Sequence, residues 1–131
     1  MLETYLKQLS SQYSLLVNFE KDVEGFMHLQ IDPHLDLFLK ELPKGMMCKA
    51  TVAPMPGKDQ EDLLALLMRA NYLGQGTKGG VLALDDTAQT IIFFSSISYE
   101  YTYPEFKDKI EEVMNYLNYW KTRIKDETSK R

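Results

Sequence analysis

The sequence predicts an α+β domain in which helices pack on an antiparallel sheet and the elements follow the order α-βββ-α-ββ-α. Three observations support this prediction. Apolar residues recur at helical spacing in three separate segments. Between these segments, apolar and polar residues alternate over short runs that end at proline, glycine or aspartate, as in half-buried strands joined by turns. Hydrophobic residues make up 44% of the 131 residues, which is enough for the core of one domain.

The first helix is predicted from Leu2 to Leu16. Its apolar residues lie three or four positions apart, so they form one stripe with polar residues on the other faces. The stripe consists of Leu2, Tyr5, Leu6, Leu9, Tyr13 and Leu16. A polar connector follows at residues 20–25.

Three strands are predicted next, at residues 27–31, 35–39 and 46–52. In the first two, every second residue is apolar, which turns one face of the strand towards a core. Asp32-Pro33 supplies the first turn and Pro43-Lys44-Gly45 the second. These residue types favour turns because aspartate bonds nearby backbone, proline fixes φ and glycine tolerates positive φ.

A second helix is predicted from Asp59 to Leu73. Asp59 suits the N-cap, and Gly74 suits the left-handed position that follows a helix. The apolar residues of this helix are Leu63, Leu64, Leu66, Leu67 and Ala70. They cover a wide arc, which predicts two buried sides, one on the sheet and one on another surface.

A hairpin and a long helix complete the domain. Residues 81–84 and 90–97 have the composition of strands, with a turn at residues 85–88. Pro104 opens the last helix at a position that tolerates proline. The apolar stripe of this helix is Phe106, Ile110, Val113, Met114, Leu117, Trp120 and Ile124.

We expect a single domain over residues 1–125, with a short charged tail at residues 126–131. The formal charge of −4 and the pI of about 5.2 argue against nucleic-acid binding, which needs clustered lysine and arginine. The single cysteine, Cys48, allows no internal disulfide, and the sequence shows neither a signal peptide nor a stretch as long as a membrane span. These features favour the reducing cytosol and predict no insertion into a membrane.

No set of residues has the pattern of a catalytic, metal or cofactor site. In residues 74–80 the glycines follow a helix and precede a strand, which is the reverse of a phosphate-binding loop. His28, His34 and Cys48 are scattered and form no short-range ligand pair. The serines near residue 95 lack a nucleophile elbow. The sequence therefore predicts no enzyme activity, no cofactor and no bound metal.

Apolar residues exceed the needs of one small core, which favours a protein-binding function. The Met46-Met47 pair and Met55 add to the wide arc of the second helix, and methionine adapts its shape to varied partners. The alternation of Tyr99, Tyr101 and Tyr103 either continues a strand or forms an exposed aromatic recognition strip. Large exposed apolar patches usually mark interfaces.

Two neighbouring stretches resemble a known family. Residues 66–74 read LLMRANYLG, a leucine-rich helix that ends in Asn-aromatic-x-Gly, and residues 79–85 read GGVLALD, a glycine turn followed by a strand. The final helix is also similar, with Phe106 near its start and Trp120 near its end. Together with the element order, these stretches resemble the class I type III secretion chaperones, also called the CesT-like or Tir chaperone family.

The resemblance implies a chaperone of the bacterial cytosol that binds the N-terminal segment of a secreted effector protein, keeps it competent for secretion and uses no ATP. Members of this family form a dimer, built largely from the second helix and the next strand. By position, the dimer-interface candidates are Leu63, Leu66, Leu67, Ala70, Leu82 and Leu84. The effector would contact the first helix and the sheet and add a strand to an open edge. The effector-binding candidates are Leu2, Leu6, Leu9, Met27 and Phe38.

Two alternatives differ in their expected surfaces. A regulatory binding protein of the same fold would pair with a related chaperone as a heterodimer or sequester a regulator of transcription or secretion. A small-ligand binder or an enzyme would instead hold a deep pocket with converging polar groups.

Overall fold

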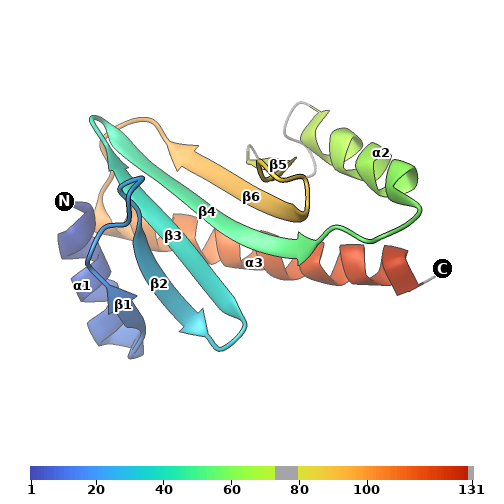
Figure 1. Cartoon of the computed structure of the whole chain (residues 1–131). Coiled ribbons are helices and arrows are strands. Elements are labelled where there is room, and N and C mark those ends of the chain that lie inside the picture. Colours follow the sequence, from blue (N-terminus) through green and yellow to red (C-terminus); the bar gives the residue numbers. More distant parts are fainter. Residues whose placement is uncertain (73–79, 130–131) are drawn as a thin grey trace.

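The computed structural model describes residues 1–72 and 80–129, and these residues form three helices and six strands (Figure 1). The elements are α1 (Leu2–Tyr13), β1 (Leu16–Asn18), β2 (Met27–Asp32), β3 (Leu35–Leu42), β4 (Gly45–Pro54), α2 (Gln60–Asn71), β5 (Val81–Leu84), β6 (Thr90–Ile97) and α3 (Tyr103–Ser129). The predicted α+β class is confirmed. The sheet contains one strand more than predicted, β1.

The six strands form one antiparallel sheet in the order β1-β2-β3-β4-β6-β5. Strands β1 and β5 are therefore its two edges. In Figure 1, α3 runs along one face of the sheet, with α1 towards the β1 end and α2 towards the β5 end. None of the described helices crosses the opposite face, which we call the outer face.

Strand β1 lies where the sequence predicted the last turn of the first helix. The helix ends at Tyr13, because Ser14 adopts a left-handed conformation (φ 56°) and its N–H bonds the carbonyl of Ser10. Leu16 then pairs with Gln30 of β2. The helical spacing of Leu16 was therefore misleading, and the predicted helix was three residues too long.

The core lies between the sheet and the helices α1 and α3. Alternate residues of β2, β3, β4 and β6 are buried, as the sequence pattern predicted. Six residues of the predicted stripe on α3 are also buried: Phe106, Ile110, Val113, Leu117, Trp120 and Ile124. Burying one such side chain contributes about 1.5–3 kcal/mol, so this stripe fixes α3 against the sheet.

Three details around the helices differ from the predictions. Tyr101 is buried in a loop between β6 and α3, with its ring 5.6 Å from that of Tyr5 in an edge-on contact, so the tyrosine alternation continues no strand. Asp59 occupies the N-cap position of α2 but makes no side-chain capping hydrogen bond. Helix α3 continues to Ser129, four residues into the predicted tail, where the pair Arg123–Glu127 (3.0 Å) supports its last turns. The predicted cap Gly74 lies outside the described residues.

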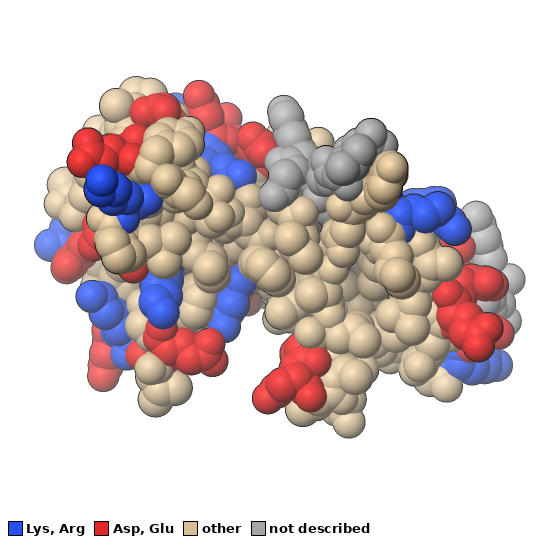
Figure 2. Space-filling view, turned by 90° about the horizontal axis from the view of Figure 1, so that it is seen from above, with Lys and Arg blue, Asp and Glu red and all other residues tan. Residues whose placement is uncertain are grey.

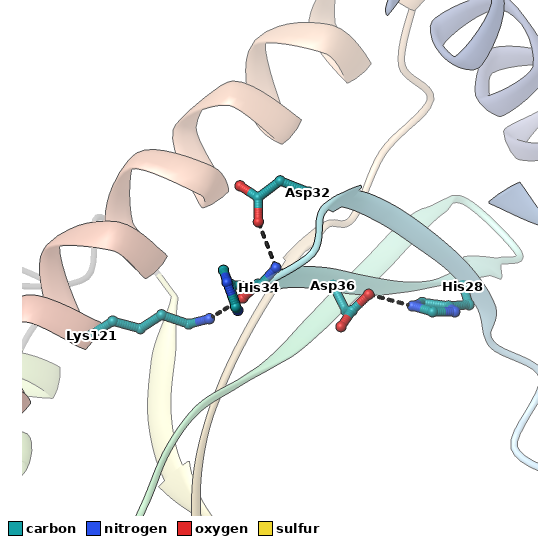
Figure 3. A network of polar contacts seen from close by, with 5 residues as sticks. All are labelled: His28, Asp32, His34, Asp36 and Lys121. Carbon is teal, nitrogen blue, oxygen red and sulfur yellow. Dashed lines mark hydrogen bonds and ion pairs between the residues drawn. The ribbon is translucent and has the colours of Figure 1, made fainter. Parts of the chain in front are cut away.

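The turn between β2 and β3 is fastened to α3 (Figure 3). Lys121 Nζ donates a hydrogen bond to the carbonyl of His34 (2.7 Å). The N–H of His34 donates in turn to Asp32 Oδ1 (2.7 Å), which closes the predicted aspartate turn. One long lysine side chain therefore connects the far end of this hairpin to the helix beneath the sheet.

Glu41 fastens the start of α1 to the end of β3 and makes this contact sensitive to acid. The N–H of Leu2 donates to Glu41 Oε1 (3.1 Å), and this hydrogen bond is the main reason that the pKa of Glu41 lies below its ordinary value of 4.5. Because the folded pKa is lower than the unfolded one, the contact stabilises the fold above about pH 4.5 and is lost as the pH falls through the folded pKa. We expect the Glu41→Gln protein to lose part of the acid sensitivity of the wild type.

The measurement is the urea midpoint at a series of pH values between neutral pH and pH 3 or so, for both proteins. The two curves should converge towards acid pH and separate above it. The exposed Glu20→Gln substitution is the matched control and should reproduce the wild-type curve. A Glu41→Gln protein with the full pH dependence of the wild type would contradict this role for Glu41.

Candidate interaction surfaces

The predicted dimer-interface residues divide into two groups in the structure. Leu63, Leu67, Ala70 and Leu82 are between 3% and 7% exposed and pack inside the chain itself. They occupy the buried side of α2 and the inward position of β5, so they offer no side chain to a partner. Leu66 and Leu84 are half-buried and pack at the margin of the core. Only these two of the six candidates can contact a second chain without rearrangement.

Three further apolar residues, on α2, at its C-cap and on β5, are exposed, and the sequence pattern did not indicate them. Met68 is 73% exposed, Tyr72 67% and Val81 37%. Met68 lies on α2 and Tyr72 is the C-cap residue that follows this helix, and neither belongs to the leucine-rich arc. We call the apolar residues of α2, its C-cap and β5 that are not fully buried, namely Leu66, Met68, Tyr72, Val81 and Leu84, the α2–β5 surface, although they point in more than one direction: Leu66 lines the groove towards α3 and Val81 lies on the outer face. Of these five residues, only Leu66 belongs to the wide arc that predicted a second apolar side.

An open groove of about 1040 Å³ separates α2 from α3. Leu66 and Ala70 line it on α2, and Tyr116, Tyr119 and Trp120 line it on α3. Three acidic residues of α3 also line it, namely Asp108, Glu111 and Glu112. The lining of this groove is part apolar and part charged. Leu66 belongs both to the groove and to the α2–β5 surface, so the groove is a shallow extension of that surface.

Four of the five predicted effector-binding residues belong to the core. Leu2, Leu6, Leu9 and Met27 are between 0% and 3% exposed, because the stripe of α1 and the inward face of β2 pack on each other and on α3. They offer no surface in this fold, which corrects their predicted placement. Phe38 is the exception, since it is half-buried on the outer face.

Phe38 belongs to a row of residues that crosses the outer face. The strand registers place His28, Phe38, Lys49, Phe94 and Val81 next to one another on five adjacent strands. The rings of His28 and Phe38 stack with centres 4.8 Å apart. We call these five residues the outer-face row. The row combines two phenylalanines and a valine with a histidine and a lysine. It lies on a face that none of the described helices covers (Figure 1).

Polar contacts fix the side chains around this row. The Lys49 ammonium lies 4.3 Å from the centre of the Phe26 ring and 3.7 Å from the Glu24 carboxylate. Two hollows of about 340 and 370 Å³ adjoin the row, and both are lined by Asp22 and Phe38.

The charged side chains are unevenly distributed over the molecule. Seen from above, they gather mainly towards its two ends, with a broad zone of uncharged residues between them (Figure 2).

His28 is also held from its other side. Its Nε2 lies 2.8 Å from Asp36 Oδ1, on the neighbouring strand (Figure 3). The imidazole ring is thus fixed between a carboxylate and the face of Phe38, which makes the β2–β3 part of the outer face a rigid aromatic platform.

Cys48, the histidines and the acidic residues are the candidates for a nucleophile or a metal site in the described part of the chain. Cys48 is fully buried, and this burial raises the pKa of its thiol to about 12, so it is not a nucleophile. In the described part of the chain, no three histidine, cysteine or acidic residues converge on a point where a metal could bind. Gly80 packs against the ring of Phe93, since a Cβ there would lie 2.5 Å from that ring.

No helix of residues 1–72 and 80–129 is long and apolar enough to cross a membrane.

Comparisons with known proteins identify the fold and the family of the chain. No curated protein matches the sequence. Among solved structures, the fold is similar to a chain of the HopA1–SchA chaperone–effector complex, with a TM-score of 0.66 and 19% identity over 92% of this chain and 93% of that one. It is also similar to a chain of the heterodimeric ExoU–SpcU complex from the type III secretion system of Pseudomonas aeruginosa, with a TM-score of 0.65 and 17% identity over 94% and 93%.

The same architecture occurs in YbjN, a putative transcription regulator from E. coli, with a TM-score of 0.68 and 14% identity over 98% of this chain and 93% of that one. At such identities these likenesses establish a shared fold alone. The family is established by the sequence itself, because the model of the Tir chaperone protein (CesT) family matches residues 4–121. The chain therefore belongs to the Tir chaperone protein (CesT) family.

Proposed function

We propose that this protein is a type III secretion chaperone of the bacterial cytoplasm that binds the N-terminal segment of a secreted effector and keeps it competent for secretion without ATP. The observation that carries the proposal is the outer face with its aromatic row, over which none of the described helices lies, in a chain of the CesT family. An extended client segment fits such a face because it has no core of its own to bury its apolar side chains.

The physical logic favours an unfolded client. A segment laid across the outer-face row gains many small apolar contacts, and it gains backbone hydrogen bonds if it pairs with an edge strand. These gains offset the entropy that the segment loses on ordering. The net charge of −4 keeps the chaperone soluble although it exposes apolar patches.

The proposal includes a dimer, formed at the α2–β5 surface. Met68, Tyr72 and Val81 are large apolar side chains that stay exposed in the single chain, and this supports an interface that includes the C-terminal part of α2 and β5. The partner is a second copy of this chain or a related chaperone.

Capture of the client from the native cytosol tests the function. The tagged protein should retain a secreted protein, and the N-terminal fragment of that protein alone should bind in solution. Recovery of small metabolites without a protein would contradict the proposal.

Phe38→Asp then tests the site. The substitution removes the Phe38 ring, and a carboxylate buried beneath an apolar segment costs about 3 kcal/mol or more, which corresponds to a loss of affinity of about 100-fold or more. Thr4→Asp, on the exposed side of α1, is the matched control and should bind as the wild type does. If Phe38→Asp binds the captured fragment as tightly as the control, the client lies elsewhere, with the groove between α2 and α3 as the next surface to test.

A further inference from the structure

The two edge strands of the sheet differ in the hydrogen-bond partners of their backbone groups. An edge strand offers unpaired N–H and C=O groups on which another strand can add. β1 is short, and its Leu16 is 69% exposed. β5 lies beside α2, and one side chain of that helix reaches its backbone.

Asn71, the last residue of α2, makes two hydrogen bonds to a single residue of β5. Its Nδ2 donates to the carbonyl of Leu82 (2.7 Å), and the N–H of Leu82 donates to its Oδ1 (2.8 Å). The amide side chain thus forms the same closed pair of bonds that a residue of a neighbouring strand would form. It stands in for a seventh strand at this one position.

The register shows which edge these bonds occupy. Leu82 lies opposite Phe93 of β6, and among residues 1–72 and 80–129 β5 has a neighbouring strand on that side only. In an antiparallel pair, a residue turns both of its backbone groups either towards its partner strand or away from it. Since both groups of Leu82 bond Asn71, Leu82 points them away from β6. Asn71 therefore occupies the outward groups near the middle of β5 (Val81–Leu84).

We propose that Asn71 closes the β5 edge to strand addition, so that two copies of this chain meet through the side chains of the α2–β5 surface and not through one continuous sheet. The occupant that it excludes is the β5 edge of a second copy, which the proposed dimer brings close. The proposal rests on the proposed function for that dimer, whereas the closed edge itself is a property of the single chain.

A fastening role alone would give a different result from a closed edge. If Asn71 only attached α2 to the sheet, every substitution would lower stability and none would create a new contact. If it closes the edge, then Asn71→Ala exposes the outward groups of Leu82 to another strand. Asn71→Asp weakens the attachment too, because a carboxylate cannot donate to the carbonyl of Leu82, but its charge still repels an incoming edge.

The experiment compares the full-length wild type with Asn71→Ala, Asn71→Asp and, as a control, the exposed Asn118→Ala. Sedimentation velocity over a range of protein concentrations gives the assembly state, and hydrogen exchange gives the protection of the β5 amides. In Asn71→Ala, the Leu82 amide should exchange about tenfold faster when dilute, since one backbone bond is lost. At high concentration this variant should form larger species in which the Leu82 amide becomes protected again. Asn71→Asp and Asn118→Ala should keep the assembly state of the wild type.

Three results would overturn the proposal. The first is an Asn71→Ala protein that never assembles beyond the wild type. The second is an Asn71→Asp protein that assembles as readily as Asn71→Ala. The third, which applies even if Asn71→Ala does not fold, is a Leu82 amide that already exchanges at an unprotected rate in the wild type. A different outcome would contradict the proposed dimer alone. In that outcome the wild type is monomeric, its Leu82 amide exchanges slowly, and Asn71→Ala assembles through β5, so the proposal of a closed edge is supported.

Discussion

Replacing Gly45 with alanine is expected to lower the free energy of unfolding by about 3–5 kcal/mol, a large share of the stability of a domain of this size. Gly45 starts β4 with a φ of +134°, a conformation that residues with a side chain rarely adopt. A Cβ at this position would lie 1.8 Å from the carbonyl oxygen of Ile97. That neighbour is backbone of β6, so the conflict cannot be relieved by rotating a side chain. The first pairs between β4 and β6 would have to separate.

Urea denaturation followed by circular dichroism measures this loss, and Gly57→Ala is the matched control. A Cβ on Gly57 would meet no atom within 4 Å. That substitution should leave stability unchanged or raise it by a few tenths of a kcal/mol or so, because alanine restricts the unfolded chain. Equal denaturation midpoints for the two variants would contradict this prediction. They would show that β4 and β6 can move apart near Gly45 at little cost in free energy.

The overall fold was predictable because its elements are locally consistent. The alternation around Leu37 and the stripe of α3 from Phe106 to Ile124 each follow one period throughout, and the structure buries those residues as expected. The strand β1 was not predictable in this way. Leu16 satisfies the helical spacing of α1 and also the apolar run of a strand, and only the left-handed conformation of Ser14 decides between them.

The interaction surfaces were harder to predict, because an apolar stripe has the same pattern whether it faces a core or a partner. Leu6 was expected to contact an effector, but it is completely buried in the core. Conversely, Met68 lies among leucines that are buried and is itself 73% exposed. Sequence pattern fixes the faces of a helix, whereas packing decides which face is left uncovered.

Contacts between distant elements could not be read from the sequence at all. The outer-face row exists only through the register of five strands, which brings Phe38 beside Lys49 and Lys49 beside Phe94. Asn71 was recognisable as part of a motif, but its pairing with Leu82 depends on how α2 meets β5. Such sites follow from geometry that several elements determine together.

Met68→Asp is expected to separate the proposed dimer while leaving the single chain folded. Met68 is 73% exposed, so a carboxylate there stays hydrated in the monomer and costs it little. In a dimer formed at the α2–β5 surface, the same carboxylate would be buried without a partner, at a cost of about 3 kcal/mol or more. Since 1.4 kcal/mol is a factor of ten in Kd, the dissociation constant should rise by about 100-fold or more. Light scattering on a dilution series measures the change.

Leu66→Asp should have the larger effect, because it acts on both the dimer and the monomer. Leu66 is half-buried against the core as well as part of the α2–β5 surface, so its replacement should give monomers with a lower urea midpoint. Val23→Asp is the matched control, since Val23 is fully exposed in the connector before β2 and the same change there should alter neither quantity. Stable dimers of both Met68→Asp and Leu66→Asp would place the contact on another surface. A dimer lost only in Leu66→Asp would instead assign it to the side of α2 that faces the groove, because Met68 and Leu66 lie on opposite flanks of the helix.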